Sequence, residues 1–368
     1  MDIRVLHIVT YMGRGGLETM LMNYYRHIDR NKVQFDFLVH RDFEADYDAE
    51  IRELGGKIYH ISRLIPWSHS YREKLKHFFR EHSEYKIVHV HQDCLSSVAL
   101  QCAKECGVPV RIAHSHTSSA VKDLKYLIKK YYMKKIPVYA TDLFACVKQA
   151  GNWMFRGNDF RVIPNGICVQ DYIYSEKKRK KIRKESDTEN NLVIGHVGNL
   201  TRAKNHEFLL RVFCEILKKE SSAQLILVGD GKFQEKIKKQ AIQLGIQENI
   251  FFTGTRSDVN ELMQAMDVFV FPSLYEGLPV TMIEAQAAGL PCVISDYVSE
   301  ECIVTSDLIS VMKLSDSVEM WAECALQKVK IDRRNTSEEI EKAGYDIKIA
   351  AKKLEQIYLE KYDKYGVK

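Results

Sequence analysis

Short apolar runs alternate with amphipathic segments along the first third of the chain. Five runs have the length and the branched or aromatic composition of buried strands: residues 4–10, 33–39, 57–61, 87–91 and 110–114. The segments between them repeat their apolar residues with helical spacing: residues 17–27, 47–54, 71–82 and 96–106. A regular alternation of strand and helix predicts a parallel, doubly wound sheet.

The alternation begins again in the second half of the chain. Six more apolar runs are predicted to be strands: residues 193–197, 224–228, 250–253, 268–271, 292–295 and 309–312. Helical spacing fills the intervals: residues 206–219, 232–244, 259–265 and 280–288. Because there are two sets of alternating elements, we expect an α/β fold of two Rossmann-like, doubly wound domains that face each other across a cleft.

A turn and a change in polarity place the domain boundary. Residues 163–166, Ile-Pro-Asn-Gly, interrupt the first pattern. Residues 176–185 are polar and basic, which we interpret as a solvated linker, with a second contact to an anionic membrane as the alternative. A long helical pattern from Asp346 to about Tyr362 follows the second set of strands. The predicted domains are residues 1–168 and 169–345, and residues 346–368 form a helix that returns towards the first domain.

The total charge conceals two halves of opposite sign. The 368 residues are 45% hydrophobic and 28% charged, which excludes a disordered or collagen-like chain. Residues 1–185 contain 32 Lys and Arg against 21 Asp and Glu, a net +11, whereas residues 186–368 contain 22 against 28, a net −6. The basic half indicates an anionic ligand or surface. Its cations are not interleaved with stacking aromatic residues on a recognisable module, so nucleic-acid binding is not expected.

The sequence predicts a cytoplasmic protein. A strand pattern begins at the N-terminus with no signal-peptide pattern before it, and no apolar run approaches the roughly 18 residues that span a bilayer. The nine cysteines are scattered without metal-ligand spacing, which indicates buried or inert thiols.

Residues 121–135 form an amphipathic, basic stretch. One side is apolar and the other carries lysines: Leu124, Leu127, Ile128 and Tyr131 against Lys122, Lys125 and Lys129. Such a helix can pack its apolar side on the domain, or it can lie on an anionic membrane at the inner face. The sequence leaves both interpretations open.

Residues 269–289 combine a strand, a loop and an apolar helix with two carboxylates. The strand ends at Pro272, the loop carries Glu276 and Gly277, and the helix begins near Pro279 and ends before Gly289. The helix is apolar apart from Glu284, and a buried lone charge is costly without a partner. Either neighbouring protein groups satisfy Glu284, or it accepts hydrogen bonds from a sugar diol, as acidic residues do in nucleotide-binding folds.

The spacing of Glu276 and Glu284, within Pro-Ser-x-x-Glu-Gly-Leu-Pro and Glu-Ala-x-Ala-x-Gly-x-Pro, closely resembles the retaining glycosyltransferases of family 4. Four further segments match the family in the expected order: Gly15-Gly16-Leu-Glu18, residues 163–167, residues 227–231 and residues 252–254. The resemblance covers nearly the whole chain and implies the GT-B fold, with an acceptor-binding N-terminal domain and a nucleotide-sugar-binding C-terminal domain.

The resemblance also implies roles for residues of the C-terminal domain. Glu284 matches the ribose-binding residue, and Glu276 matches a residue that contacts donor-sugar hydroxyls near the reacting carbon. Gly277 and Leu278 match backbone donors to the sugar and the diphosphate. Three further residues are assigned to the donor by position: Gly229 in the nucleotide-domain turn, and Thr255 and Arg256 where the family holds the base.

The phosphate-binding segment, residues 197–206, departs from the family pattern. Lys204 matches the family lysine, but Asn199 stands where the family has an arginine. Arg202 lies in the same loop and is the candidate substitute. Two cations beside a diphosphate would form charge-assisted hydrogen bonds, which are about twice as strong as neutral ones.

Two loops of the N-terminal domain complete the candidate site. Gly15 and Gly16 follow the first strand, where the resemblance implies a close backbone approach to the donor phosphate and the acceptor. His114 and His116 follow the strand at 110–113, and one of them, preferably His116, is implied to reach the donor sugar. No third ligand stands near this pair in the sequence, so no metal site is predicted.

These assignments imply a retaining hexosyltransferase. A sugar would move from a nucleotide-sugar donor to a glycan or lipid-linked acceptor in the synthesis of a cell-surface polysaccharide such as a capsule or exopolysaccharide. The resemblance to the family implies a UDP-sugar as the donor. No metal or other cofactor is implied. Two alternatives remain: a nucleotide-sugar epimerase on the same fold, and a non-catalytic nucleotide-sugar-binding subunit, for which the arginine missing at Asn199 is the reason.

Overall fold

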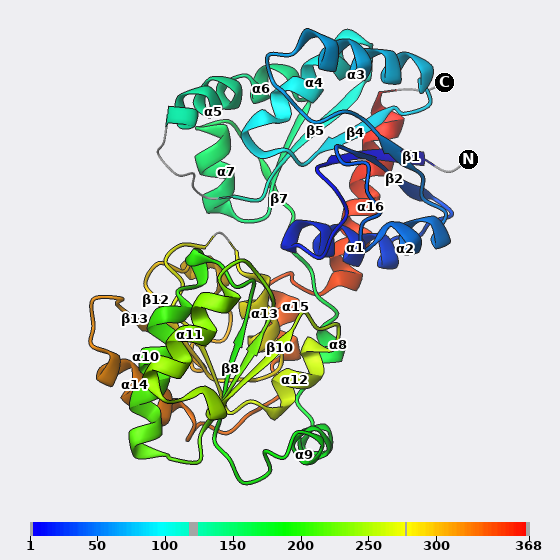
Figure 1. Ribbon diagram of the computed structural model, residues 1–368. Coiled ribbons are helices and arrows are strands. Elements are labelled where there is room, and N and C mark those ends of the chain that lie inside the picture. The colour runs from blue at the N-terminus through cyan, green and yellow to red at the C-terminus, as the bar shows by residue number, and fades with distance from the viewer. Residues whose placement is uncertain (1–2, 118–123, 277, 366–368) are drawn as a thin grey trace. The chain divides into compact units, whose positions relative to one another are not determined.

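The computed structural model describes residues 3–117, 124–276 and 278–365, and the chain divides into two compact units (Figure 1). The first unit comprises Met1–Ile167 and Gly344–Lys368, and the second comprises Cys168–Ala343. Each unit is a parallel sheet covered by helices, as the alternation of apolar and amphipathic segments predicts.

The first unit contains a seven-stranded sheet in the order β3-β2-β1-β4-β5-β6-β7. Its strands are β1 (Ile3–Val9), β2 (Val33–Val39), β3 (Ile58–His60), β4 (Ile87–Val90), β5 (Val110–Ser115), β6 (Asp142–Ala145) and β7 (Arg161–Val162). Its helices include α1 (Gly16–His27), α2 (Asp48–Glu53), α3 (His69–Glu81), α4 (Ser96–Glu105), α5 (Leu124–Lys134), α6 (Ile136–Tyr139) and α7 (Lys148–Phe155). The strand order reverses between β1 and β4, and ligands of such sheets bind at this point, beyond the carboxyl ends of the strands.

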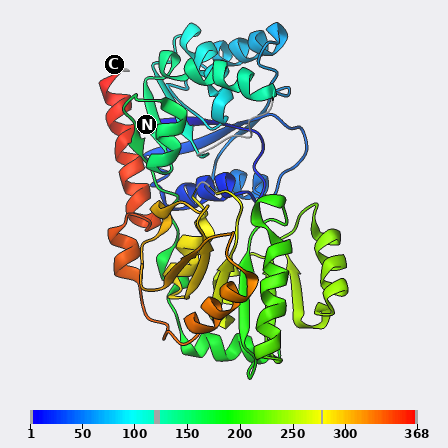
Figure 2. The same ribbon diagram turned by 90° about the vertical axis from the view of Figure 1, so that its left-hand side faces the viewer.

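The C-terminal helix α16 (Ile347–Lys364) belongs to the first unit, where it packs against α1 and β2 (Figure 2). The segment by which the chain leaves this unit lies beside the segment by which it returns. Ile167 N donates to Tyr345 O (2.8 Å), and Ile347 N donates to Ile167 O (2.9 Å). A Cβ atom on Gly166 would lie 3.0 Å from the backbone of Ile347, so this close approach favours glycine.

The second unit contains a six-stranded sheet in the order β10-β9-β8-β11-β12-β13. Its strands are β8 (Val193–Val197), β9 (Gln224–Val228), β10 (Ile250–Gly254), β11 (Val268–Phe271), β12 (Cys292–Ser295) and β13 (Ile309–Met312). Its helices include α8 (Val169–Tyr172), α10 (His206–Lys219), α11 (Gln234–Leu244), α12 (Val259–Ala265), α13 (Val280–Ala287), α14 (Val318–Lys328) and α15 (Ser337–Lys342). Leu209, Phe213 and Trp321 are fully buried in its core.

The basic stretch that we interpreted as a linker is a helix, α9 (Glu176–Glu185), so that interpretation is wrong. Ser175 caps its N-terminus by accepting a hydrogen bond from Lys178 N. Arg179 and Arg183 are one helical turn apart, and both guanidinium groups bind the carboxylate of Asp267. One face of this basic helix is therefore anchored to the second unit.

Candidate functional site

The loop of the second unit that is predicted to bind phosphate begins where β8 ends. A turn of 3-10 helix (Arg202–Lys204) and Asn205, which has a left-handed backbone (φ 54°), connect the loop to α10. A Cβ atom on Gly229 would lie 2.3 Å from Gly198 O, and one on Gly198 would lie 2.9 Å from Lys204 Cε. Glycine at these two positions lets the loops after β8 and β9 approach each other and lets Lys204 fold over the first of them.

Lys204 and Glu276 form an ion pair in this loop region. Lys204 Nζ lies 2.7 Å from Glu276 Oε1, and the two side chains are only 15% and 14% exposed. The ammonium group also lies 4.5 Å from the ring centre of Phe271, a cation–π contact. The structure thus brings together two predicted donor-binding residues that are far apart in the sequence.

A backbone hydrogen bond joins the two loops that carry this pair. Leu274 N donates to Ala203 O at 2.7 Å, so the loop after β11 is tied to the turn that holds Lys204. Leu278 is buried just before α13, and Gly277 lies outside the described residues.

Glu284 lies half-buried on α13, and its hydrogen-bond partner is Tyr172 of α8. The Tyr172 hydroxyl donates to Glu284 Oε1 at 2.8 Å. Burial raises the pKa of Glu284, and the Tyr172 hydrogen bond opposes that effect. A carboxylate has roughly four acceptor positions, so this single bond is compatible with a further diol. The apolar sequence around Glu284 indicated that it needs a partner, but only the fold identifies Tyr172.

The remaining predicted donor residues of the second unit are exposed. Asn199 and Arg202 lie in the same loop as Lys204, and Thr255 follows β10. Arg256 makes two hydrogen bonds with the Asp258 carboxylate, at 2.8 and 2.6 Å. The guanidinium group of Arg256 is therefore paired with Asp258, and it takes no part in the Lys204–Glu276 ion pair.

In the first unit, the glycine loop after β1 leads into α1. Gly15 precedes the first turn of the helix, and Gly15 O accepts a hydrogen bond from Thr19 N at 2.9 Å. A Cβ atom on Gly15 would lie 2.2 Å from a carboxylate oxygen of Glu18, whereas one on Gly16 would meet nothing within 4 Å. Burial raises the pKa of Glu18.

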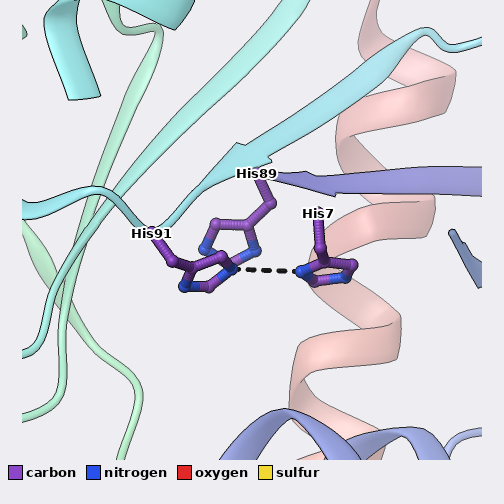
Figure 3. A group of neighbouring side chains, drawn as sticks. All are labelled: His7, His89 and His91. Atoms are coloured by element: carbon purple, nitrogen blue, oxygen red, sulfur yellow. Dashed lines mark hydrogen bonds between the residues drawn. The ribbon is translucent and has the colours of Figure 1, made fainter. Parts of the chain in front are cut away.

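His114 and His116 belong to a cluster of five histidines at the centre of the first sheet. The cluster draws His7 from β1, His89 from β4 and His114 from β5, with His91 and His116 directly after the last two strands. Figure 3 shows His7, His89 and His91, with the hydrogen bond between His7 Nδ1 and His91 Nε2 (3.1 Å). A second bond joins His91 Nδ1 to His116 Nε2 (2.9 Å), and a third joins His114 Nδ1 to His89 Nε2 (3.2 Å).

Burial keeps these imidazoles neutral. It lowers the pKa of His7 and His116 to about 3 and those of the other three well below the usual histidine value. In the sequence, His89 and His91 end one predicted strand in the same way as His114 and His116 end another, which we interpret as structural, and His7 is not singled out. The available signal was the repeated His-x-His pattern at the ends of two predicted strands, which the sheet places side by side.

Comparisons with known proteins cover both units. Residues 14–171 match the family described as Glycosyltransferase Family 4, and residues 177–346 match Glycosyl transferases group 1. EpsF from Bacillus subtilis (strain 168) is 35% identical over 363 residues, which cover 93% of each chain. The capsular polysaccharide biosynthesis glycosyltransferase CapH from Staphylococcus aureus is 25% identical over 373 residues, covering 98% of this chain and 99% of CapH.

The fold also matches solved structures. Alr3699/HepE from Anabaena, crystallised in complex with UDP, superposes with a TM-score of 0.77 at 17% identity, covering 98% of this chain and 100% of that one. Among the residues that the structure describes, no helix has the length and apolar character needed to cross a membrane. With both of its units matched to these families and a relative that aligns along nearly its whole length, the chain belongs to the group 1 and family 4 glycosyltransferases and has the GT-B fold.

Proposed function

We propose that this glycosyltransferase moves a hexose from a UDP-sugar to a glycan or lipid-linked acceptor, with retention of the anomeric configuration, in the synthesis of a cell-surface polysaccharide. The observations that carry the proposal are the Lys204–Glu276 ion pair, whose side chains are only 15% and 14% exposed, and the half-buried carboxylate of Glu284 on α13. The role of CapH in capsular polysaccharide biosynthesis and the UDP and UDP-glucose complexes of HepE support the choice of product and donor.

Each group of the second unit has a task in this reaction. Glu284 accepts hydrogen bonds from the ribose diol, and Lys204 binds the diphosphate, assisted by Arg202. Thr255 and Arg256 lie beside the base. As the donor binds, the diphosphate takes Lys204 as its counter-ion, which releases Glu276 to accept hydrogen bonds from the donor-sugar hydroxyls.

The chemical step is a front-side displacement. The bond between the anomeric carbon and the leaving diphosphate oxygen breaks, the acceptor oxygen bonds to the same face of that carbon, and the acceptor proton passes to the diphosphate. Negative charge grows on the leaving oxygen, and a preorganised cation such as Lys204 stabilises it. Because the chain supplies these cations itself, we propose that transfer requires neither a metal nor another cofactor.

In the first unit, we assign His116 rather than His114 to the donor sugar. His114 is enclosed and bonded to His89, whereas His116 is half-buried. Gly15 and Gly16 provide a backbone without side chains for the approach of the donor phosphate and the acceptor.

A thermal-shift series with UDP-, GDP- and ADP-sugars tests the donor. A ligand at 100 times its dissociation constant stabilises a protein by about 2.7 kcal/mol, so the donor that binds should raise the melting temperature. We expect the largest rise with UDP-sugars. Glu284→Ala should abolish most of this shift, and Glu323→Ala, which removes an exposed carboxylate of the same unit, should preserve it. A larger shift with GDP- or ADP-sugars would overturn the choice of UDP. In a separate assay with the donor but no acceptor, epimerisation of the donor sugar would favour the alternative of a nucleotide-sugar epimerase.

Helix α5 supports contact with an anionic membrane at the cytoplasmic face. Leu127 and Tyr131 of the predicted apolar side are 67% and 55% exposed, and Ile128 is exposed as well. These side chains do not pack on the domain, which favours the membrane interpretation over the alternative. Lys122 lies outside the described residues, as do the side chains of Leu124 and Lys125.

Vesicle flotation tests this surface. The protein should bind vesicles rich in anionic lipid, more weakly at high salt, because each lysine near such a surface contributes about 1 kcal/mol. Replacing Lys129, Lys130, Lys134 and Lys135 by glutamine should abolish binding. The matched control replaces four exposed lysines of α9 by glutamine: Lys177, Lys178, Lys180 and Lys181. Equal loss in the control, or no binding by the wild type, would contradict the proposal.

A further inference from the structure

The histidine cluster of the first unit contains ring nitrogens without partners. Among the described residues, His7 Nε2, His114 Nε2 and His116 Nδ1 are buried and have no hydrogen-bond partner. Buried polar atoms are nearly always satisfied, since leaving one unpaired costs roughly 1–3 kcal/mol. Two of these atoms, on His114 and His116, belong to histidines that lie close to each other, and they point to a ligand that accepts imidazole lone pairs.

Three of the histidines have the separation that a chelated ion needs. Each of His91, His114 and His116 offers one ring nitrogen, and these three nitrogens all lie within 4.8 Å of one another. A tetrahedral zinc ion with bonds of about 2.0–2.1 Å holds its nitrogen ligands roughly 3.3 Å apart, so the widest separation must shrink by up to about 1.5 Å to complete the set. The rings of His114 and His116 are inclined by 33°, so one of them must turn to aim at a common ion.

His116 is the ligand that can make this adjustment. It follows Ser115, the last residue of β5, and its side chain is half-buried. His91 and His114 are buried, and the parallel pairing of β4 with β5 fixes the positions of the backbone that carries them. Two fixed ligands and one adjustable ligand at the edge of the sheet leave a route for an ion.

The other two histidines provide the outer partners that metal-bound imidazoles require. When Nε2 of His114 binds an ion, its Nδ1–H donates to His89 Nε2, and His89 Nδ1–H donates to the Tyr358 hydroxyl oxygen, a contact of 2.7 Å. When His91 binds through Nδ1, the ion replaces the 2.9 Å hydrogen bond between that nitrogen and His116 Nε2, and His91 Nε2–H donates to His7 Nδ1. Such second partners fix the tautomer and the orientation of a ligand ring.

We propose that His91, His114 and His116 form a binding site for a divalent transition metal ion of the zinc class, with His7 and His89 as its orienting partners. Neutral imidazoles suit zinc, cobalt, nickel and copper and do not suit magnesium or calcium, which take oxygen ligands. The ion has no part in sugar transfer. It occupies His116, so metal binding and the contact of His116 with the donor sugar exclude each other. This last consequence rests on the proposed function, whereas metal binding itself does not.

The test is cobalt titration of the full chain without substrates. The wild type should take up one Co²⁺ per chain, with the visible absorption of a tetrahedral site and no thiolate charge-transfer band, and Zn²⁺ should displace it. His116→Ala should weaken binding by more than the roughly 10- to 100-fold cost of losing an outer partner. His77→Ala, at an exposed histidine of the same unit, is the matched control and should bind as the wild type does.

Three results would overturn the proposal: no stoichiometric uptake by the wild type, a thiolate spectrum, or equal uptake by His116→Ala. Because His116 is half-buried, its alanine variant should fold, and circular dichroism verifies this. His7→Phe, which removes an outer partner and no ligand, should show the smaller loss. Binding that depends on His7 but not on His116 would place the ion elsewhere and count against the proposal. If Co²⁺ binds as expected but the wild type transfers no sugar, the proposed function fails and the metal site stands.

Discussion

Lys204→Ala is expected to lower turnover at least a hundredfold while the protein remains folded. A hundredfold loss corresponds to about 2.7 kcal/mol of transition-state stabilisation, which is the range for removing one preorganised electrostatic group from an active site. Lys204 is suited to this role because its side chain is only 15% exposed and its ammonium group lies 4.5 Å from the ring centre of Phe271, a contact that does not involve Glu276. A cation held in this way needs little reorganisation when charge develops on the leaving diphosphate.

The matched control for Lys204 is Lys219→Ala. Lys219 also forms an ion pair in the second unit, at 2.8 Å from Glu323, but that pair is 47% and 58% exposed. An exposed pair of this kind contributes at most about 1 kcal/mol, so turnover should stay near the wild-type rate. Near wild-type turnover by Lys204→Ala, measured as initial rates at saturating donor, would refute the assigned role.

Glu276→Ala is expected to cause a loss of turnover of similar size by a different route. We propose that Glu276 holds the donor-sugar hydroxyls and does not touch the nucleotide. UDP alone should therefore bind the variant at least as tightly as the wild type, because Lys204 is freed from its carboxylate. Isothermal titration with UDP, together with the turnover assay, separates a sugar contact from a general loss of the site.

Glu276→Gln refines this result. The amide keeps one acceptor oxygen but loses the charge, so it should recover part of the activity if sugar hydroxyls are the partners. Glu323→Ala is the control, since it removes a carboxylate of similar ion-pair geometry from the surface of the same unit. A variant that loses UDP binding in parallel with turnover would show that Glu276 acts on the nucleotide instead.

Much of the fold follows from local pattern. The run at residues 4–10 predicts β1, and the apolar run at 268–271 coincides with β11. Strand and helix periodicity are properties of a few consecutive residues, so the predicted alternation is confirmed in both sheets. The motif around Glu276 and Glu284 is also local, which is why it indicated the family before any geometry was known.

The contacts between residues of the candidate site could not be predicted from local sequence patterns. Lys204 and Glu276 are both present in the motifs, but their ion pair depends on β8 and β11 lying side by side. Tyr172 meets Glu284 only because α8 packs on α13. The prediction of a linker at residues 176–185 is wrong because the charge pattern of α9 is that of a solvated segment, whereas the carboxylate that binds Arg179 and Arg183 lies far away in the sequence, at Asp267.

The sequence by itself determined the class of fold, the two sets of alternating elements and the residue types of the candidate donor site. Periodicity and motif spacing act over short stretches of chain, and those features are local. Only the tertiary structure decided which charges are paired, that the apolar side of α5 is exposed, and that histidines from β1, β4 and β5 form one cluster. These features depend on strand order, and strand order is set by packing between segments distant in the chain.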